Sequence, residues 1–260
     1  MSKDTNTAQQ PVRAPGWQRV LMEARAPFEF AASLAAWPVL ATSPRGDGHA
    51  VIVYPGFVAS DISTAPLRAL LRLLGHDVHG WGQGRNTNAS PEVLARALEH
   101  VRELHRSSGR KVSLVGWSLG GLYARELAKG APEAVRCVVS MGSPFTGPAR
   151  ATNVTGLFDF VNRGRPRVQR SRDDLRATPP VPTTSIYSRS DGVVAWQCSV
   201  EQTGPMSENI EVAASHTGMG VNPLVLHALA DRLAQREGQW RPFSRKGLRK
   251  LAFPDPQRST

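Results

Sequence analysis

Cysteine is scarce in this sequence: only Cys137 and Cys198 occur among its 260 residues. Two cysteines cannot build the disulfide framework that stabilises many small secreted domains. Cys137 lies in the run VRCVVSM, which is typical of a buried strand. We therefore expect this thiol to pack as a small apolar side chain.

Long apolar runs are also missing. No stretch reaches the roughly 18 uncharged apolar residues that a membrane-spanning helix needs, and the most apolar window, residues 28–41, contains Glu29 and Pro38. The opening residues, MSKDTNTAQQ, lack the basic start and apolar core of a secretory signal. These absences favour a cytoplasmic protein.

Acidic residues are outnumbered, since 21 Asp and Glu face 32 Lys and Arg, which gives a net charge of +11. Basic residues concentrate in segments 163–176 and 241–258. Neither segment is strongly periodic, so solvated basic loops are the simpler interpretation, and peripheral contact with an anionic membrane surface is the alternative. Nucleic acid is not expected as a partner, because aromatic residues are not interleaved with these charges.

From His49 onward, β-branched runs alternate with helical patterns, which predicts a mostly parallel sheet flanked by helices. The length suits one globular domain, which we divide into an N-terminal extension (1–48), an α/β core (49–240) and a basic tail (241–260). The expected strands span residues 49–54, 76–81, 111–115, 135–141, 183–187 and 209–212. The expected helices span residues 63–74, 91–108, 118–129 and 222–237.

One segment, residues 143–182, does not fit this alternation and is rich in Arg, Pro, Gly and Thr. A connection of this length is usually functional or disordered. We interpret residues 145–182 as a small cap or lid whose apolar underside carries Phe158 and Phe160, with a disordered surface excursion as the alternative.

The run VSLVGWSLGG places Ser118 in a G-x-S-x-G motif. A buried strand precedes the motif and a helix follows it, and this is the context in which such a serine is a nucleophile on a sharp strand-to-helix turn. The flanking glycines fit a turn that larger side chains would obstruct. A serine hydroxyl is a weak nucleophile, however, and it needs a base and an orienting acid.

The base and the acid are expected after the serine, each on a loop that follows a later strand. His216 is the only histidine that meets this condition: His227 lies inside the last expected helix, and the others precede Ser118. Asp191 follows the strand at 183–187 in the same way. The competing acids are Asp173 and Asp174, which have arginines beside them, and Asp159 in the expected cap.

An oxyanion hole requires backbone donors beside the nucleophile. The amide of Leu119 comes directly after the serine, and the turn Tyr54-Pro55-Gly56-Phe57 follows the first strand. We assign the second donor to Phe57, because Gly56 permits a close backbone approach. An ordinary Pro-Gly turn is the alternative.

The motifs VIVYPGF, LVGWSLGG, SMGSPFTG, SRSDGVV and SHTGMG resemble those of the α/β-hydrolase superfamily, and within it the bacterial lipases and esterases. The resemblance covers most of the chain but not its first 48 residues. It departs from the usual pattern at three positions: Pro55 and Trp117, where such lipases often have histidine, and Phe145, where a Gly-x-Pro-His turn is frequent. The change at Pro55 leaves the amide of Phe57 in place.

The resemblance implies an α/β-hydrolase fold and hydrolysis of a carboxylic ester, small or lipid, without a metal or an organic cofactor. Ser118, Asp191 and His216 are then the catalytic triad, and Phe57 and Leu119 form the oxyanion hole. Trp117, Phe145 and Phe158 are candidates for the acyl pocket, with plain core packing as the alternative for the first two. An acyltransferase or thioesterase with the same triad and a non-catalytic binding protein on this fold are the rival functions.

Overall fold

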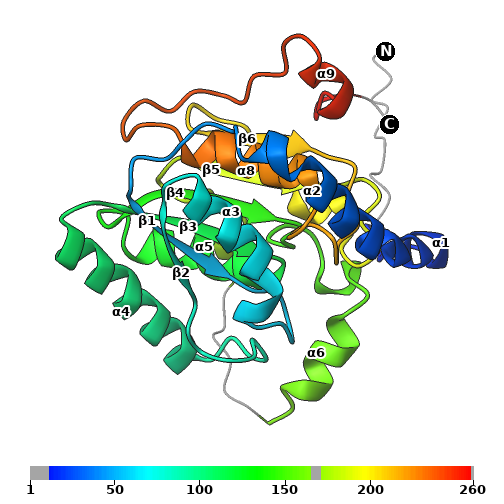
Figure 1. Ribbon diagram of the computed structural model, residues 1–260. Coiled ribbons are helices and arrows are strands. Elements are labelled where there is room, and N and C mark those ends of the chain that lie inside the picture. Colours follow the sequence, from blue (N-terminus) through cyan, green and yellow to red (C-terminus); the bar gives the residue numbers. More distant parts are fainter. Residues whose placement is uncertain (1–11, 165–170, 259–260) are drawn as a thin grey trace, which may run out of the picture.

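A computed structural model describes residues 12–164 and 171–258 of the chain. Its strands form one sheet in the order β2-β1-β3-β4-β5-β6 (Figure 1). The strands are β1 (Ala50–Tyr54), β2 (Asp77–Gly80), β3 (Val112–Trp117), β4 (Val135–Met141), β5 (Thr183–Tyr187) and β6 (Ser207–Glu211). Every neighbouring pair is parallel, so the carboxyl ends of all these strands lie at the same edge of the sheet.

Helices bury both faces of the sheet, and the alternation of β1 shows how. Val51 and Val53 pack in one core cluster with side chains of α2 (Ala26–Leu40), α3 (Ala65–Leu73) and α8 (Pro223–Leu233). Ile52 and Tyr54 pack in a second cluster with α4 (Pro91–Ser108) and α5 (Leu119–Gly130). A strand buried on both faces reads as a continuous apolar run, which is why the sequence pattern predicts the central strands well.

The predicted strands and helices are confirmed, with shifts at their ends. α4 begins after Ser90, whose hydroxyl accepts from the amide of Val93, and ends before Gly109, which has a left-handed φ of 64°. β3 extends two residues beyond the predicted end, because Gly116 and Trp117 pair with β4. α8 ends at Leu233, four residues before the predicted end.

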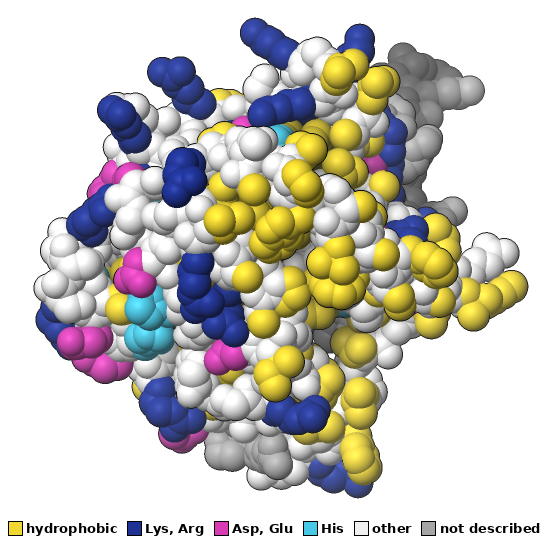
Figure 2. Space-filling model, viewed as in Figure 1, with side chains coloured by type: hydrophobic (Ala, Val, Ile, Leu, Met, Phe, Trp, Pro, Cys, Tyr) yellow, Lys and Arg dark blue, Asp and Glu magenta, His cyan; other side chains and the backbone are white. Residues whose placement is uncertain are grey.

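The N-terminal extension has a helical part, residues 17–40. It comprises α1 (Trp17–Leu21), the 3₁₀ helix η1 (Met22–Arg25) and α2, which packs against α8. Several of its large apolar side chains are exposed, among them Trp17, Phe28 and Val39. Figure 2 shows hydrophobic side chains gathered on this side of the molecule. Among the described residues, no helix is long and apolar enough to cross a bilayer.

Where it is described, the expected cap contains the 3₁₀ turn η3 (Ala149–Ala151) and two short α-helices, α6 (Thr155–Val161) and α7 (Arg172–Arg176). Residues 165–170 lie outside the described residues. The ring of Phe158 lies 5.1 Å from that of Phe57, over the carboxyl edge of the sheet. Phe160, which we expected beside it on the underside, is 70% exposed. Residues two positions apart on a helix are separated by about 200° around its axis, so the rings of Phe158 and Phe160 point in nearly opposite directions.

The basic C-terminal segment packs onto the core. Phe243 and Phe253 are buried against each other, with ring centroids 4.8 Å apart. Arg249, in the short helix α9 (Arg249–Ala252), pairs with Asp231 at 3.0 Å. Arg258 pairs with Glu211 of β6 at 2.6 Å.

Outside this segment, further 3₁₀ turns are η2 (Asp61–Thr64) and η4 (Trp196–Ser199).

A buried histidine pair lies at the amino-terminal edge of the sheet, just before β1 and β2. The rings of His49 and His76 are 5.0 Å apart in an edge-on arrangement. His49 bonds Asp47 and Ser113, at 2.6 and 2.7 Å. Within the part of the chain that the structure describes, neither ring nitrogen of His76 has a hydrogen-bond partner. Burial first, and then the neighbouring His49, lower the pKa of His76 to about 4.

This histidine makes the stability of the fold depend on pH. The unfolded chain binds a proton below the ordinary pKa of 6.5, whereas the folded chain binds one only near 4. The free energy of unfolding is therefore undiminished above pH 6.5 and falls toward pH 4 by up to about 1.4 kcal/mol per pH unit. Urea denaturation at pH 7.5 and pH 5 measures how much free energy of unfolding is lost between these two pH values. The loss should be smaller for His76→Phe than for the wild type, and the control His79→Phe should lose as much as the wild type. Equal losses in His76→Phe and the wild type would contradict this assignment.

Candidate active site

Ser118 lies in the sharp turn between β3 and α5, with φ 54° and ψ −119°. A Cβ at Gly116 would lie 2.3 Å from the carbonyl oxygen of Gly120, and one at Gly120 would lie 2.3 Å from that of Tyr54. Any other residue at these two positions would collide with backbone, which explains the glycines of the motif. The turn thus presents Ser118 at the carboxyl edge of the sheet.

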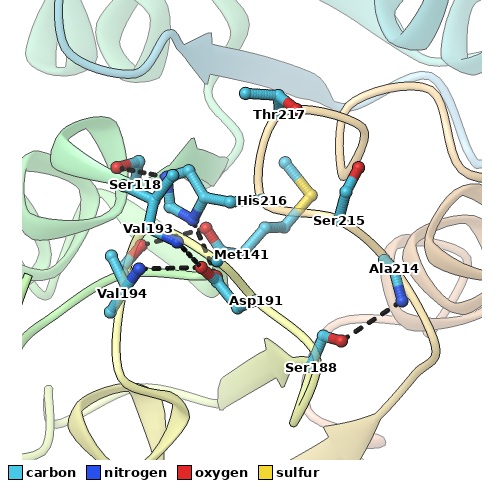
Figure 3. A network of polar contacts seen from close by, with 12 residues as sticks. Ser118, Met141, Ser188, Asp191, Val193, Val194, Ala214, Ser215, His216 and Thr217 are labelled. Carbon is cyan, nitrogen blue, oxygen red and sulfur yellow. Dashed lines mark hydrogen bonds and ion pairs between the residues drawn. The ribbon is translucent and has the colours of Figure 1, made fainter. Parts of the chain in front are cut away.

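The structure brings Ser118, His216 and Asp191 together from three loops (Figure 3). His216 lies between β6 and α8, and its Nε2 is 3.0 Å from the Oγ of Ser118. Its Nδ1 is 2.7 Å from the Oδ2 of Asp191, which follows β5. The other oxygen of Asp191 accepts from the amides of Val193 and Val194, at 2.8 and 2.7 Å. These bonds fix the direction in which the carboxylate points.

The electrostatics of this row suit a base. Burial disfavours the charged form of His216, but the adjacent Asp191 carboxylate and the more distant charge of Glu23 outweigh it and raise the pKa of His216 above its ordinary value. An ionised Asp191 requires the proton of the neutral ring to be on Nδ1, so the lone pair of Nε2 faces the serine hydroxyl. The arrangement can accept the serine proton and stabilise the resulting imidazolium.

A cavity of about 490 Å³ opens beside Ser118 under the cap. Its lining is mostly apolar and includes Phe57, Leu119, Phe145 and Phe158. Phe145 also packs in the interior, since the guanidinium of the buried Arg125 lies 3.7 Å from its ring centroid. Both sequence-based possibilities for Phe145, pocket wall and packing, therefore apply.

The two expected oxyanion donors lie on either side of the serine. Leu119 is the first residue of α5, so its amide has no acceptor within the helix. A Cβ at Gly56 would lie 3.4 Å from that of Ser118, so the turn that carries Phe57 passes close to the serine. Phe57 and Leu119 both line the cavity with Ser118, and their role as donors stays a prediction.

Trp117 does not line this cavity. Its indole Nε1 donates to the carbonyl of His216 at 3.0 Å, and its ring packs against the core cluster beneath the loop. Successive residues at the end of a strand point to opposite faces. Trp117 and Ser118 therefore point away from each other, and Trp117 lies under the histidine loop rather than beside the cavity. Its contact anchors that loop.

Two carboxylates that sequence reasoning missed also contact this region. Glu23 of η1 accepts from the amides of Gly192 and His216, and Glu29 of α2 accepts from the amide of Ser215. Their only signal in the sequence is that they interrupt an apolar segment. Across the described ranges, no group of three His, Cys, Asp or Glu side chains could hold a metal ion.

Comparison with known proteins agrees with the fold. The family model described as alpha/beta hydrolase fold matches residues 30–184. Lipase BlEst2 of Bacillus licheniformis superposes with a TM-score of 0.57 at 16% identity, covering 75% of this chain and 95% of that one. A thioesterase domain from the curacin biosynthetic pathway gives 0.52 at 14% identity, covering 74% and 93%.

Lipase B of Aspergillus fumigatus gives a TM-score of 0.55 at 17% identity over 74% of this chain. The chain spans only about half of the length of that lipase (54%). No protein of curated function matches the sequence. At these identities the structural likeness shows the fold alone. The family match extends over more than half of the chain, and it includes the strand, the serine turn and the helix described above. The chain therefore belongs to the alpha/beta hydrolase family.

Proposed function

We propose that the protein is a serine hydrolase that cleaves carboxylic esters, with Ser118 as nucleophile, His216 as base and Asp191 as orienting acid. The observation that carries this proposal is the row of contacts from Ser118 Oγ to His216 Nε2 at 3.0 Å and from His216 Nδ1 to Asp191 at 2.7 Å, beside an apolar cavity. Nucleophile, base and orienting group within hydrogen-bond reach are what acyl transfer by serine needs.

The proposed chemistry proceeds in two halves. Ser118 Oγ forms a bond to the ester carbonyl carbon while its proton passes to His216 Nε2, and the carbonyl oxygen becomes an oxyanion that the amides of Phe57 and Leu119 bind. The intermediate collapses, the C–O bond to the alcohol breaks, and His216 returns the proton to the departing oxygen. Water then repeats these steps on the acyl-enzyme, which releases the acid and restores Ser118.

The cavity supports an ester with an apolar acyl group. Its walls include Phe57, Leu122, Phe145 and Phe158, and burial of each methylene group contributes about 0.8 kcal/mol. A thioester would use the same steps with sulfur as the leaving atom, and an acyltransferase would use an alcohol in place of water. We propose the hydrolase because it needs no acyl acceptor other than water.

The experiment that tests this function combines covalent labelling with turnover. A fluorophosphonate probe should attach to Ser118, as mapped by peptide mass spectrometry, because a base-activated serine attacks phosphorus readily. p-Nitrophenyl esters of increasing acyl length should show kcat/KM rising from acetate to chains that fill the cavity.

Heat-denatured protein is the control for adventitious labelling. Labelling of a different serine, or none at all, would contradict the proposed nucleophile. Turnover with an added alcohol separates the rivals: the hydrolase yields the free acid, whereas an acyltransferase yields the new ester.

Peripheral contact with an anionic membrane surface stays a proposal for the basic segments 163–176 and 241–258. Leu248 and Leu251 support it, since they are exposed beside the basic residues Lys246 and Lys250. Lysines around exposed leucines suit the boundary between water and an anionic lipid surface.

A further inference from the structure

We infer that the N-terminal helical segment, residues 17–40, belongs to the catalytic apparatus, with Glu23 and Glu29 as positioning residues for the loops that carry Asp191 and His216. The inference rests on the proposed function, since it assigns a role in the same reaction. It goes beyond that function because it adds two carboxylates from an element that lies outside the sheet and its crossover helices.

Glu23 joins the acid loop to the base loop. One of its oxygens accepts from the amides of Gly192 and His216, at 2.8 and 2.9 Å. The other accepts from the amide and the hydroxyl of Thr217, at 2.8 and 2.7 Å. Gly192 directly follows Asp191, so a single side chain fixes the backbone next to the acid and the backbone of the base itself. Four bonds to one carboxylate leave it little freedom to move.

Glu29 holds the residue on the other side of the histidine. It accepts from the amide and the hydroxyl of Ser215, each at 2.8 Å. Arg25 pairs with Glu29 at 3.0 Å and donates to the hydroxyl of Ser190 at 2.7 Å. Backbone amides at 215, 216 and 217 are therefore all bound by carboxylates of the N-terminal segment.

Two glycines give this segment the space to approach. A Cβ at Gly192 would lie 2.2 Å from the carbonyl oxygen of Arg19 in α1, and a Cβ at Gly218 would lie 1.6 Å from Glu29. The glycines of Asp191-Gly192 and of His216-Thr217-Gly218 thus permit contact between the loops and the N-terminal helices. Both loops are shaped to receive the segment, which is a second observation independent of the hydrogen bonds.

The segment also sets the charge around the base. Asp191 faces the ring of His216, Glu23 lies against its backbone, and Glu29 lies beyond Ser215 with its charge offset by Arg25. Within the described ranges, no basic side chain pairs with Glu23. The negative charge of Glu23 contributes to the raised pKa of His216, after the larger effects of burial and of Asp191.

The test measures kcat, KM and the acid limb of kcat/KM for a short p-nitrophenyl ester in Glu23→Ala, Glu23→Gln and Glu29→Gln. Displacement of catalytic groups by about 1 Å costs up to roughly 100-fold, so Glu23→Ala should lower kcat by about 10- to 100-fold with little change in KM. Glu23→Gln keeps one acceptor oxygen and should fall between Glu23→Ala and the wild type.

The pH profile separates positioning from a general loss of structure. Activity requires neutral His216, so the acid limb has its midpoint at the pKa of this ring. Removal of the Glu23 charge lowers that pKa, and the limb should move to lower pH in both Glu23 variants. In Glu29→Gln kcat should fall while the limb stays in place, because the charges that raise the pKa of His216 are those of Asp191 and Glu23, not that of Glu29.

Glu103→Gln is the matched control, since it removes an exposed carboxylate on α4, which covers the other face of the sheet. It should change neither kcat nor the limb. Thermal unfolding is measured for every variant, and Glu23→Gln serves if Glu23→Ala does not fold. An active wild type whose folded Glu23 variants keep both kcat and the acid limb would overturn this inference alone. A wild type without hydrolysis or labelling would instead end the proposed function.

Discussion

Ser118→Ala is expected to lower kcat for ester hydrolysis by roughly 10⁴- to 10⁶-fold and to abolish fluorophosphonate labelling. The hydroxyl is the atom that would bond to the substrate, and His216 Nε2 lies 3.0 Å from it. Without it no acyl-enzyme would form, and the residual rate would reflect only the predicted oxyanion donors and binding in the cavity. Single-turnover assays with the p-nitrophenyl ester of highest kcat/KM measure the loss.

The alanine variant is a clean comparison because it keeps the Cβ. Ser118 already holds φ 54°, and alanine experiences the same backbone strain there. Circular dichroism and the thermal midpoint should therefore match those of the wild type. A folded variant that retains more than a hundredth of the wild-type kcat would remove Ser118 from the mechanism and leave another nucleophile to be found.

The core of the fold could be predicted because β1, β3 and β4 are short, mostly apolar runs. The strand at 183–187 was predicted to the residue, since Pro182 precedes it and polar residues follow it at once. The candidate site could be located for a related reason: in a parallel sheet the loops after successive strands meet at one edge. The order of Ser118, Asp191 and His216 along the chain was thus sufficient to propose that they meet.

The contribution of the N-terminal segment could not be predicted by this reasoning. Glu23 contacts residues about 170 to 190 positions further along the chain, and no local periodicity encodes such a contact. Apart from Glu29 and Ser33, α2 is apolar all the way around, so its sequence does not reveal which face packs against α8. The residues that line the pocket were harder still to predict, because Trp117 and Ser118 are adjacent in the chain but point to different sides of the turn.

The second large effect is expected at Asp191, and the two amides that bind it determine the outcome. In Asp191→Asn the introduced carbonyl oxygen should remain on the amides of Val193 and Val194, which both donate to Oδ1. The introduced NH₂ group then faces Nδ1 of His216, where Oδ2 was. A donor at this position favours the tautomer with its proton on Nε2, and that nitrogen can no longer accept the proton of Ser118.

We therefore expect Asp191→Asn to lower kcat by about 10⁴-fold while the protein stays folded, since the amide contacts of the loop survive. The acid limb should also move to lower pH, because the Asp191 charge that raises the pKa of His216 is gone. Asp173→Asn, in the exposed helix α7, is the matched control and should leave both quantities unchanged. Steady-state kinetics from pH 4.5 to 9 (roughly two units on either side of the ordinary histidine pKa) measure rate and limb together. A variant that loses rate without any movement of the limb would show that Asp191 only supports the loop, because an orienting carboxylate must alter both the tautomer and the pKa of its histidine.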